Sequence, residues 1–371
     1  MRRILLVKWG GIELWGGITV LLMNLLRHME RKDLDVDLYV FGKIKAEEIH
    51  QRFSELGVHI ICGNHDAYDP REIASDLHAI MKQKRYDVVH CNTGGLELTA
   101  IAMFTAWMHR VPVRIAHSHN SKPDERPYSR RERLYQQINR SLSTVRLCCS
   151  EAAGQHLFGR AGAKRSAVLK NGIEPERYRY DAAVREDLRR ELGVQDAFVL
   201  GHVGRFERQK NHAFLLDVFA AVHAERENAV LLLIGVGSLM QEMQEKAVRL
   251  GLEGSVLFLG STDRVPDYLQ AMDAFVFPPI YEGLGIAAIE AQAADLPVIC
   301  ADTVPREARV TSRFVPVSLQ CSADRWSDVI LQEAESRQPR ADRTAELRAA
   351  GYDINSSAER LFQIYQGLQP S

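Results

Sequence analysis

The amino-acid sequence predicts an α/β protein built from two Rossmann-like domains, each with a parallel β-sheet. The chain has 371 residues, which is more than one ordinary hydrophobic core organises. Short apolar runs alternate with segments of helical periodicity, as expected for parallel strands joined by right-handed crossover helices. This alternation stops near residue 171 and begins again near residue 198, which indicates two domains.

The first domain is expected to cover residues 1–175 and to begin with a strand. Helical periodicity is clear in residues 17–29 and 73–84. Gly16 and Gly17 lie in the first strand-to-helix connection, where the lack of a side chain lets a ligand approach the backbone. The expected strands are residues 4–7, 36–41, 58–62, 88–91, 113–116 and 145–149.

The second domain is expected to cover residues 176–354. A segment with Gly172, Pro175 and a charged helical pattern separates it from the first. Residues 355–371 include a last helical pattern, which is expected to cross back onto the first domain. The expected strands of the second domain are residues 198–204, 229–234, 256–259, 275–277, 297–300 and 313–317.

The composition is that of a soluble globular protein, with 46% hydrophobic and 26% charged residues. No run approaches the roughly 20 apolar residues of a membrane span, and the N-terminus leads directly into the first strand. We therefore expect a cytoplasmic protein, with the inner face of the cell membrane as the alternative location. The six cysteines lack the spacing of metal sites or disulfide frameworks and fit reduced, buried thiols.

Charge is distributed unevenly along the chain. Residues 1–180 contain 28 Lys and Arg against 20 Asp and Glu, a balance of +8, and the remainder is 19 against 28, or −9. Tyr, Leu and Ile are interleaved with the cations of residues 121–150, which predicts contact with an anionic membrane or a lipid-diphosphate acceptor. A solvated Arg-rich helix is the alternative, and nucleic acid is not expected. The cations assigned to this patch are Arg126, Arg130, Arg131 and Arg133.

Two glutamates mark the most informative segment. Glu282 and Glu290 flank a Gly-containing turn between an expected strand and a helix. Backbone N–H groups and the helix dipole at such a place suit an anion, whereas carboxylates suit sugar hydroxyls. Arg205 and Lys210 follow another expected strand and supply cations. Because ligands of parallel sheets bind at the carboxyl ends of strands, these residues together predict a nucleotide-sugar site.

With these motifs the chain resembles retaining glycosyltransferases of the GT-B fold, in particular the GT4 family of capsule and exopolysaccharide enzymes. The resemblance covers nearly the whole chain and implies two Rossmann-like domains that face each other across a cleft. The residues that carry it are Gly16-Gly17, Asn171-Gly172, Gly204-Arg205, Lys210-Asn211 and the segment from Glu282 to Glu290.

The resemblance implies roles for these residues. Arg205 and Lys210 would hold the donor diphosphate and balance the charge of the leaving group, so no metal or other cofactor is expected. Both are expected in a polar cleft, so replacing either should leave the fold intact. Glu282 would contact the transferred sugar and Glu290 the ribose. The other donor-binding residues implied are Gly16, Gly17, Asn171, Gly204, Gly235, Val265, Gly283, Leu284, Gly285 and Ile286.

Two histidines, His117 and His119, follow the expected strand 113–116. Relatives often carry one functional histidine here, near the transferred sugar, and the sequence does not decide which of the two is equivalent. No further ligand cluster accompanies the pair, so it does not predict a metal site. A structural role in the loop is the alternative for either one.

Two other features depart from the family or resemble a different one. Asp35 and Asp37 form the DxD pattern of metal-dependent glycosyltransferases, but they lie at the start of their expected strand instead of its end and are interpreted as a solvated strand entry. Asp295 stands where relatives carry glycine before Leu-Pro. It is expected behind the site.

The sequence thus predicts a retaining hexosyltransferase of bacterial polysaccharide synthesis. It would move a hexose from a nucleotide diphosphate sugar, expected to be a UDP-sugar, to a sugar or lipid-linked sugar acceptor. Two alternatives stay open: a GT-B-type nucleotide-sugar epimerase and a catalytically silent nucleotide-sugar-binding subunit. A dinucleotide dehydrogenase is disfavoured because no GxGxxG motif opens either domain.

Overall fold

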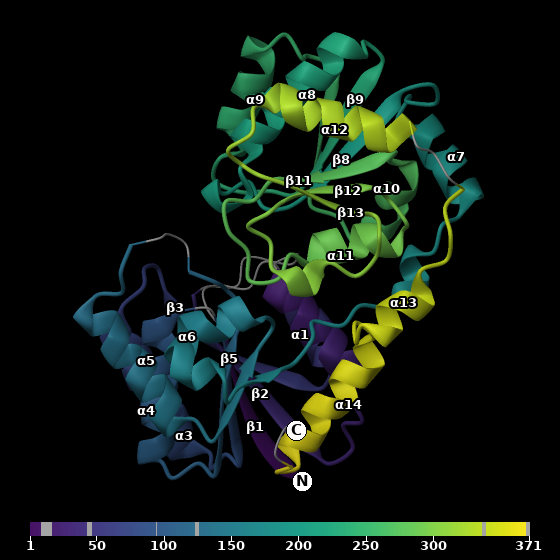
Figure 1. The fold of residues 1–371 in the computed structure, drawn as a ribbon. Coiled ribbons are helices and arrows are strands. Elements are labelled where there is room, and N and C mark those ends of the chain that lie inside the picture. The colour runs from purple at the N-terminus through teal and green to yellow at the C-terminus, as the bar shows by residue number, and fades with distance from the viewer. Residues whose placement is uncertain (9–16, 43–46, 94, 123–125, 336–338, 369–371) are drawn as a thin grey trace. The chain divides into compact units, whose positions relative to one another are not determined.

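A computed structural model describes residues 1–8, 17–42, 47–93, 95–122, 126–335 and 339–368 (Figure 1). The chain forms two compact units. Unit one contains Met1–Ile173 and Gly351–Ser371, and unit two contains Glu174–Ala350. The domain boundaries expected from the sequence lie after residues 175 and 354.

Unit one has a seven-stranded parallel sheet with the order β3-β2-β1-β4-β5-β6-β7. All six expected strands are confirmed, while β7 has only two residues and is too short for a periodicity argument. The strands are β1 (Arg2–Lys8), β2 (Leu34–Gly42), β3 (Val58–His65), β4 (Val88–Thr93), β5 (Val113–Ser118), β6 (Val145–Cys148) and β7 (Ala167–Val168).

Helices cover both faces of this sheet because successive strand residues point to opposite sides. Ile4 and Leu6 of β1 belong to one hydrophobic core, which α1 and α14 complete. Leu5 and Val7 belong to a second core on the other face, with α3 and α4. The helices are α1 (Gly17–His28), α2 (Glu47–Glu55), α3 (Pro70–Gln83), α4 (Leu96–Met108), α5 (Arg130–Leu142), α6 (Glu151–Ala163) and α14 (Ile354–Tyr365).

Unit two has a six-stranded parallel sheet with the order β10-β9-β8-β11-β12-β13. All six expected strands are confirmed. Its strands are β8 (Phe198–Val203), β9 (Ala229–Ile234), β10 (Val256–Gly260), β11 (Ala274–Phe277), β12 (Val298–Ala301) and β13 (Phe314–Val317). Its helices are η1 (Pro175–Tyr178), α7 (Ala182–Glu191), η2 (Arg208–Lys210), α8 (His212–Glu225), α9 (Met240–Arg249), α10 (Val265–Ala271), α11 (Ile286–Ala293), η3 (Arg306–Ala308), α12 (Ala323–Glu335) and α13 (Thr344–Ala349).

The chain leaves unit one and returns to it at neighbouring places. Ile173 donates its N–H to the Tyr352 carbonyl (2.9 Å), and its own carbonyl accepts the N–H of Ile354 (2.8 Å). Gly172 allows this pairing, because a Cβ there would lie 2.6 Å from the Ile354 Cα. The returning segment then enters α14, which packs beside α1 (Figure 1).

The expectation for Asp35 and Asp37 is wrong. Both lie within β2, which begins at Leu34 opposite Arg2 of β1. Asp37 is only 3% exposed and accepts hydrogen bonds from Lys84 Nζ (2.8 Å) and the Tyr86 hydroxyl (2.5 Å). A buried carboxylate requires such partners, so this pattern is part of the fold.

Asp295 has a structural role that the sequence did not reveal. Its φ of 52° lies in the left-handed region, where glycine is common and Asp is tolerated better than most residues. Its fully buried carboxylate accepts hydrogen bonds from Arg313 Nε (3.1 Å), Arg343 Nε (2.8 Å) and the Ala341 N–H (2.6 Å). The side chain that replaces the family glycine therefore ties the end of α11 to the returning chain.

Candidate active site

The candidate donor site lies in unit two, at the carboxyl ends of the neighbouring strands β8 and β11 (Figure 1). Within the sheet, β8 lies between two strands: β9, which follows it in the chain, is its neighbour on one edge, and β11 is its neighbour on the other edge. Open α/β sheets bind ligands where the strand order reverses in this way. Residues 204–211 follow β8 and residues 278–285 follow β11, so the two motifs of the sequence meet at this point.

Hydrogen bonds join these two loops along their length. Backbone carbonyls of one loop accept from backbone or amide N–H groups of the other. The bonds run from the Asn211 amide to the Pro278 carbonyl (3.1 Å), from the Ile280 N–H to the Gln209 carbonyl (2.9 Å) and from the Gln209 amide to the Tyr281 carbonyl (3.1 Å). The loops are therefore fixed relative to each other before any ligand binds.

Lys210 and Glu282 form an ion pair within this frame. The Lys210 side chain is 17% exposed and that of Glu282 is 8% exposed. Lys210 Nζ also lies 4.9 Å from the ring centroid of Phe277. The GT4 resemblance implies that Lys210 binds the diphosphate and Glu282 the sugar, and no sequence motif indicates that the two bind each other. An ammonium has three N–H donors, so this pairing leaves Lys210 able to bind a further acceptor.

Arg205 differs from Lys210 in its surroundings, because its side chain is exposed. Gly204 precedes it, and the loop after β9 packs directly on this place. A Cβ on Gly235 would lie 2.1 Å from the Gly204 carbonyl oxygen, and the φ of 142° at Gly235 also favours glycine. A Cβ on Gly237 would lie 2.5 Å from the Phe206 carbonyl oxygen. The glycines after β9 thus serve close packing of two backbone loops, which a GxG pattern alone did not establish.

The loop after β11 ends at the N-terminus of α11. Gly285 is the N-cap residue with a φ of 89°, and a Cβ there would lie 3.2 Å from Val304. As a glycine, Gly285 supplies no side-chain cap, so the N–H groups of Ile286 and Ala287 can reach an acceptor, whereas that of Ala288 bonds to the Gly285 carbonyl (3.0 Å). Leu284 is buried and Gly283 has no side chain, so this turn offers its backbone. Together with the helix dipole, the arrangement suits an anion.

Glu290 lies one turn into α11 and is held by Tyr178 of η1. The Tyr178 hydroxyl donates a hydrogen bond to Glu290 Oε1 (2.9 Å). Burial disfavours the charged carboxylate and raises the pKa of Glu290 to about 7. Without a ligand, this carboxyl group is therefore protonated in a large fraction of molecules near neutral pH.

His117 and His119 lie in unit one, at the carboxyl end of β5. Both are buried, with 1% and 7% of their surface exposed. Burial lowers the pKa of His119 to about 4 and that of His117 well below its usual value, so both rings are neutral. A third histidine, His90 of β4, contacts His117, and this neighbour had no signal in the sequence.

The two halves of the chain match two glycosyltransferase family models. The model described as Glycosyltransferase Family 4 matches residues 15–177, and the model described as Glycosyl transferases group 1 matches residues 184–343. The chain belongs to the GT4 family of glycosyltransferases. The family expected from the motifs is confirmed, and the chain is a transferase by this membership.

Relatives and solved structures are similar along most of the chain. EpsF of Bacillus subtilis, which is named provisionally as a glycosyltransferase, is 29% identical over 360 residues, or 94% of this chain and 93% of EpsF. The UDP-Gal:alpha-D-GlcNAc-diphosphoundecaprenol alpha-1,3-galactosyltransferase of Escherichia coli is 26% identical over 268 residues, covering 68% of this chain and 67% of the relative. HepE of Anabaena, in a crystal structure with UDP and glucose, has a TM-score of 0.81 at 18% identity, covering 99% of this chain and 100% of HepE. This likeness confirms the GT-B fold.

The remaining donor residues implied by the GT4 resemblance are spread over both units. Gly17 begins α1, and Asn171 lies half-buried in the segment that leaves unit one. Val265 begins α10 in unit two, and Ile286 begins α11. Gly16 lies outside the described residues. Within the described part of the chain, no three His, Cys, Asp or Glu side chains are grouped so that they could hold a metal ion.

The predicted basic patch lies on α5 and the segment before it. Arg126 forms an ion pair with Glu132 (2.8 Å), and Arg131 forms one with Glu97. Arg130 and Arg133 are exposed. Part of the patch is therefore neutralised by neighbouring carboxylates. None of the helices in the described ranges is long and apolar enough to cross a membrane.

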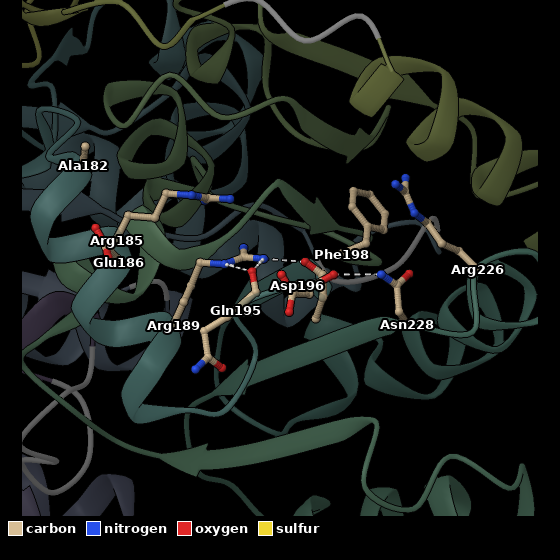
Figure 2. A pocket seen from close by; sticks show the side chains of 10 residues that line it. Ala182, Arg185, Glu186, Arg189, Gln195, Asp196, Phe198, Arg226 and Asn228 are labelled. Atoms are coloured by element: carbon tan, nitrogen blue, oxygen red, sulfur yellow. Dashed lines mark hydrogen bonds between the residues drawn. The ribbon is translucent and has the colours of Figure 1, made fainter.

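A pocket of about 420 Å³ lies elsewhere in unit two (Figure 2). It includes Phe198, the first residue of β8, and is therefore at the end of the strand opposite to Gly204. Its arginines are engaged by the protein: Arg185 pairs with Asp273 (2.7 Å), and Arg189 donates to the Gln195 carbonyl (3.1 Å). The pocket thus belongs to the packing of α7 and is separate from the candidate donor site.

The ion pair leads to a prediction that differs from the sequence-based expectation of an unaffected fold. Lys210→Ala should lower the free energy of unfolding by about 3–5 kcal/mol, because it leaves the buried Glu282 carboxylate unpaired. The double variant Lys210→Met with Glu282→Gln should recover most of this loss. Arg205→Ala, the control at an exposed cation of the same site, should change stability by at most about 0.5 kcal/mol. Urea unfolding measures all three, and a stable Lys210→Ala variant would contradict a structural role for the pair.

The pKa of Glu290 predicts a dependence of stability on pH. Since its folded pKa of about 7 exceeds the usual value of 4.5, its stabilising effect is complete below pH 4.5 and is lost as the pH rises through 7. Glu290→Gln imitates the protonated form and can still accept from Tyr178. This variant should be more stable than the wild type by about 1–3 kcal/mol at pH 8 and equal to it at pH 4.5. Urea unfolding at the two pH values tests this. An equal difference in stability between Glu290→Gln and the wild type at both pH values would show that Glu290 has its ordinary pKa.

Proposed function

We propose that this chain is a retaining hexosyltransferase that uses a nucleotide diphosphate sugar, with a UDP-sugar as donor. The observation that carries the proposal is the joined pair of loops after β8 and β11. They bring an exposed arginine, a lysine–glutamate pair and an uncapped helix N-terminus to one place. Such a site offers cations and N–H groups to a diphosphate and a carboxylate to sugar hydroxyls. UDP and glucose in the HepE crystal support this choice of donor.

The site residues divide the work of donor binding. Arg205, Lys210 and the N-terminus of α11 bind the diphosphate, and Glu282 accepts hydrogen bonds from the transferred hexose. Glu290 accepts from the ribose hydroxyls, which favours its ionised form. Cleavage of the glycosyl–phosphate bond leaves negative charge on the nucleotide diphosphate, which these fixed cations and N–H groups stabilise. The reaction therefore needs no divalent metal ion in this proposal.

We propose retention of configuration on the resemblance to retaining GT4 enzymes, and the residues of unit one bear on how retention is reached. The residues described at the carboxyl ends of β4 and β5 include Asn92, Thr93, His117 and His119, and a carboxylate nucleophile is not among these four. We favour a direct same-face displacement. The bond from the anomeric carbon to the phosphate oxygen breaks, and the bond to the acceptor oxygen forms. The departing phosphate oxygen accepts the proton of the acceptor hydroxyl. A nucleotide-sugar epimerase would need acid and base groups in place of these neutral side chains.

The acceptor side is proposed to meet a membrane surface in bacterial polysaccharide synthesis. The E. coli relative is named for a diphosphoundecaprenol acceptor, which is a lipid-linked sugar. Helices α4 and α5 pack against each other and expose Phe104, Trp107, Met108 and Leu134 to between 47% and 56%. The exposed Arg130 and Arg133 lie on α5 beside Leu134. Aromatic and apolar side chains that are flanked by cations are typical of surfaces that bind anionic lipid.

The donor site predicts a specific pattern of turnover. Hydrolysis of the correct donor, found by screening UDP-hexoses without an acceptor, should continue in excess EDTA. Arg205→Ala should reduce this rate by roughly 10²–10³ because one preorganised cation is lost from the leaving-group site. Its stability should be that of the wild type. Activity that EDTA abolishes and Mg²⁺ or Mn²⁺ restores would overturn the metal-free reaction, and a normal rate for Arg205→Ala would show that its role is misassigned.

The membrane proposal predicts that the cations exposed on α5 contribute to the binding of anionic vesicles. Arg130→Ser with Arg133→Ser should weaken binding to vesicles containing phosphatidylglycerol by about tenfold or more, at roughly 1 kcal/mol per cation. Trp107→Ser should weaken the apolar part of vesicle binding. This part remains in high salt, where the electrostatic part is screened. Vesicle sedimentation measures this, with donor hydrolysis unchanged in every variant. If the double variant Arg130→Ser with Arg133→Ser and the single variant Trp107→Ser both bind vesicles as the wild type does, α4 and α5 do not form the membrane-binding surface.

A further inference from the structure

Unit one contains a row of buried imidazole rings that ends at the C-terminal helix. The hydroxyl of Tyr365, the last residue of α14, lies 2.7 Å from His90 Nδ1. The other nitrogen of that ring, His90 Nε2, lies 3.2 Å from His117 Nδ1. The rings of His90 and His117 are stacked with centroids 5.3 Å apart. Contacts thus link residue 365 to the site residue His117 through a single histidine.

The hydroxyl of Tyr365 decides where the protons of this row lie. It is 1% exposed, and burial raises the pKa of Tyr365, so the phenol keeps its proton and needs an acceptor. Among the described residues, its hydrogen-bond partner is His90 Nδ1. His90 therefore carries its own proton on Nε2 and donates it to His117 Nδ1. His117 is then protonated on Nε2, since one nitrogen of a neutral imidazole accepts and the other donates.

Asn92 fixes the second site histidine in a similar way. Its Nδ2 donates to the His90 carbonyl (3.3 Å), which turns its Oδ1 toward His119. His119 Nε2 lies 3.3 Å from this oxygen and is therefore the donor. The atom left over on His119 is the acceptor Nδ1, whereas the atom left over on His117 is the donor Nε2–H.

These two remaining atoms have no hydrogen-bond partner among the residues that the structure describes. Both histidines are more than nine-tenths buried, and their ring centroids are 4.0 Å apart. Buried polar atoms without partners are rare, and an absent water, an ion or a functional role accounts for such atoms. Because both rings are neutral, the pair offers one donor and one acceptor without charge. A hydroxyl group fits this pair, since its oxygen can accept from His117 while its proton is donated to His119.

We propose that Tyr365 and His90 are positioning residues that hold His117 as a hydrogen-bond donor, while Asn92 holds His119 as the matching acceptor for one sugar hydroxyl. The hydroxyl role rests on the proposed glycosyltransferase function. The relay gives α14 a second task beside packing on α1, because its last residue sets the proton position of a site residue in the sheet.

The proton positions can be measured without any substrate. In protein with ¹⁵N-labelled histidine, long-range ¹H–¹⁵N correlation spectra should show His90, His117 and His119 protonated on Nε2. Tyr365→Phe removes the donor to His90 Nδ1 and should shift His90 and His117 to a mixture of both tautomers. His119 should stay unchanged, because Asn92 holds it. Protonation of His117 on Nδ1 in the wild type would overturn the relay before any variant is made.

Kinetics test the positioning role. Tyr365→Phe should lower kcat for sugar transfer by about 10–100-fold, as is typical of residues that orient a site group from behind, with little change in KM for the donor. Tyr39→Phe is the matched control: it removes another buried hydroxyl of unit one, which bonds to Asp76 (2.7 Å) and not to this row. It should change neither the tautomers nor kcat.

The possible failures are distinguishable. A normal kcat for Tyr365→Phe in a wild type that transfers sugar would overturn the positioning role and leave the proposed function intact. A wild type that turns over no nucleotide sugar would contradict the proposed function, and the tautomers of His117 would still confirm or overturn the relay. Thermal unfolding of Tyr365→Phe and Tyr39→Phe checks that both variants are folded.

Discussion

The ion pair between Lys210 and Glu282 joins two loops whose residues lie 72 positions apart in the sequence. Both groups are largely removed from water, so each depends on the other for the compensation of its charge. Three further hydrogen bonds connect the same loops, from Asn211, Ile280 and Gln209. The two loops meet because β8 and β11 are neighbours in the sheet, and the ion pair then fixes the spacing between the loops. Preorganisation of this kind is what electrostatic stabilisation of a leaving group requires.

The rest of the donor site is arranged around this frame. Gly235 lets the loop after β9 approach the carbonyl of Gly204. The backbone that carries the exposed Arg205 is therefore packed against this loop. Gly285 lets the chain turn directly into α11 and leaves its first N–H groups uncapped. Lys210 and Glu282 cancel each other's charge, so Arg205 and the helix N-terminus provide the net attraction for an anion.

Unit one uses a different kind of chemistry. The candidate site residues His117 and His119 are neutral because they are buried. Hydrogen bonds with His90 and Asn92 orient them, and neither of these two contacts is an ion pair. Such a site discriminates by the direction of hydrogen bonds and suits uncharged hydroxyls. In the proposed function, the candidate site of unit two therefore suits charged groups, while the histidines of unit one suit neutral hydroxyls.

The sequence alone determined the strands, the fold class and the family, because apolar periodicity and motifs at strand ends are local properties of the chain. It placed Arg205, Lys210, Glu282 and His117 at the ends of strands, and the structure has them there. It did not determine that Asp37 is buried, because that depends on Lys84 and Tyr86.

Only the tertiary structure decided how the site residues are paired. The bond between His90 and Tyr365 spans 275 positions of the sequence and exists because α14 returns to the first sheet. The pairing of Lys210 with Glu282 likewise requires β8 and β11 to be neighbours. Strand order and chain return bring distant residues into contact, and no local pattern of residues encodes a contact of that kind.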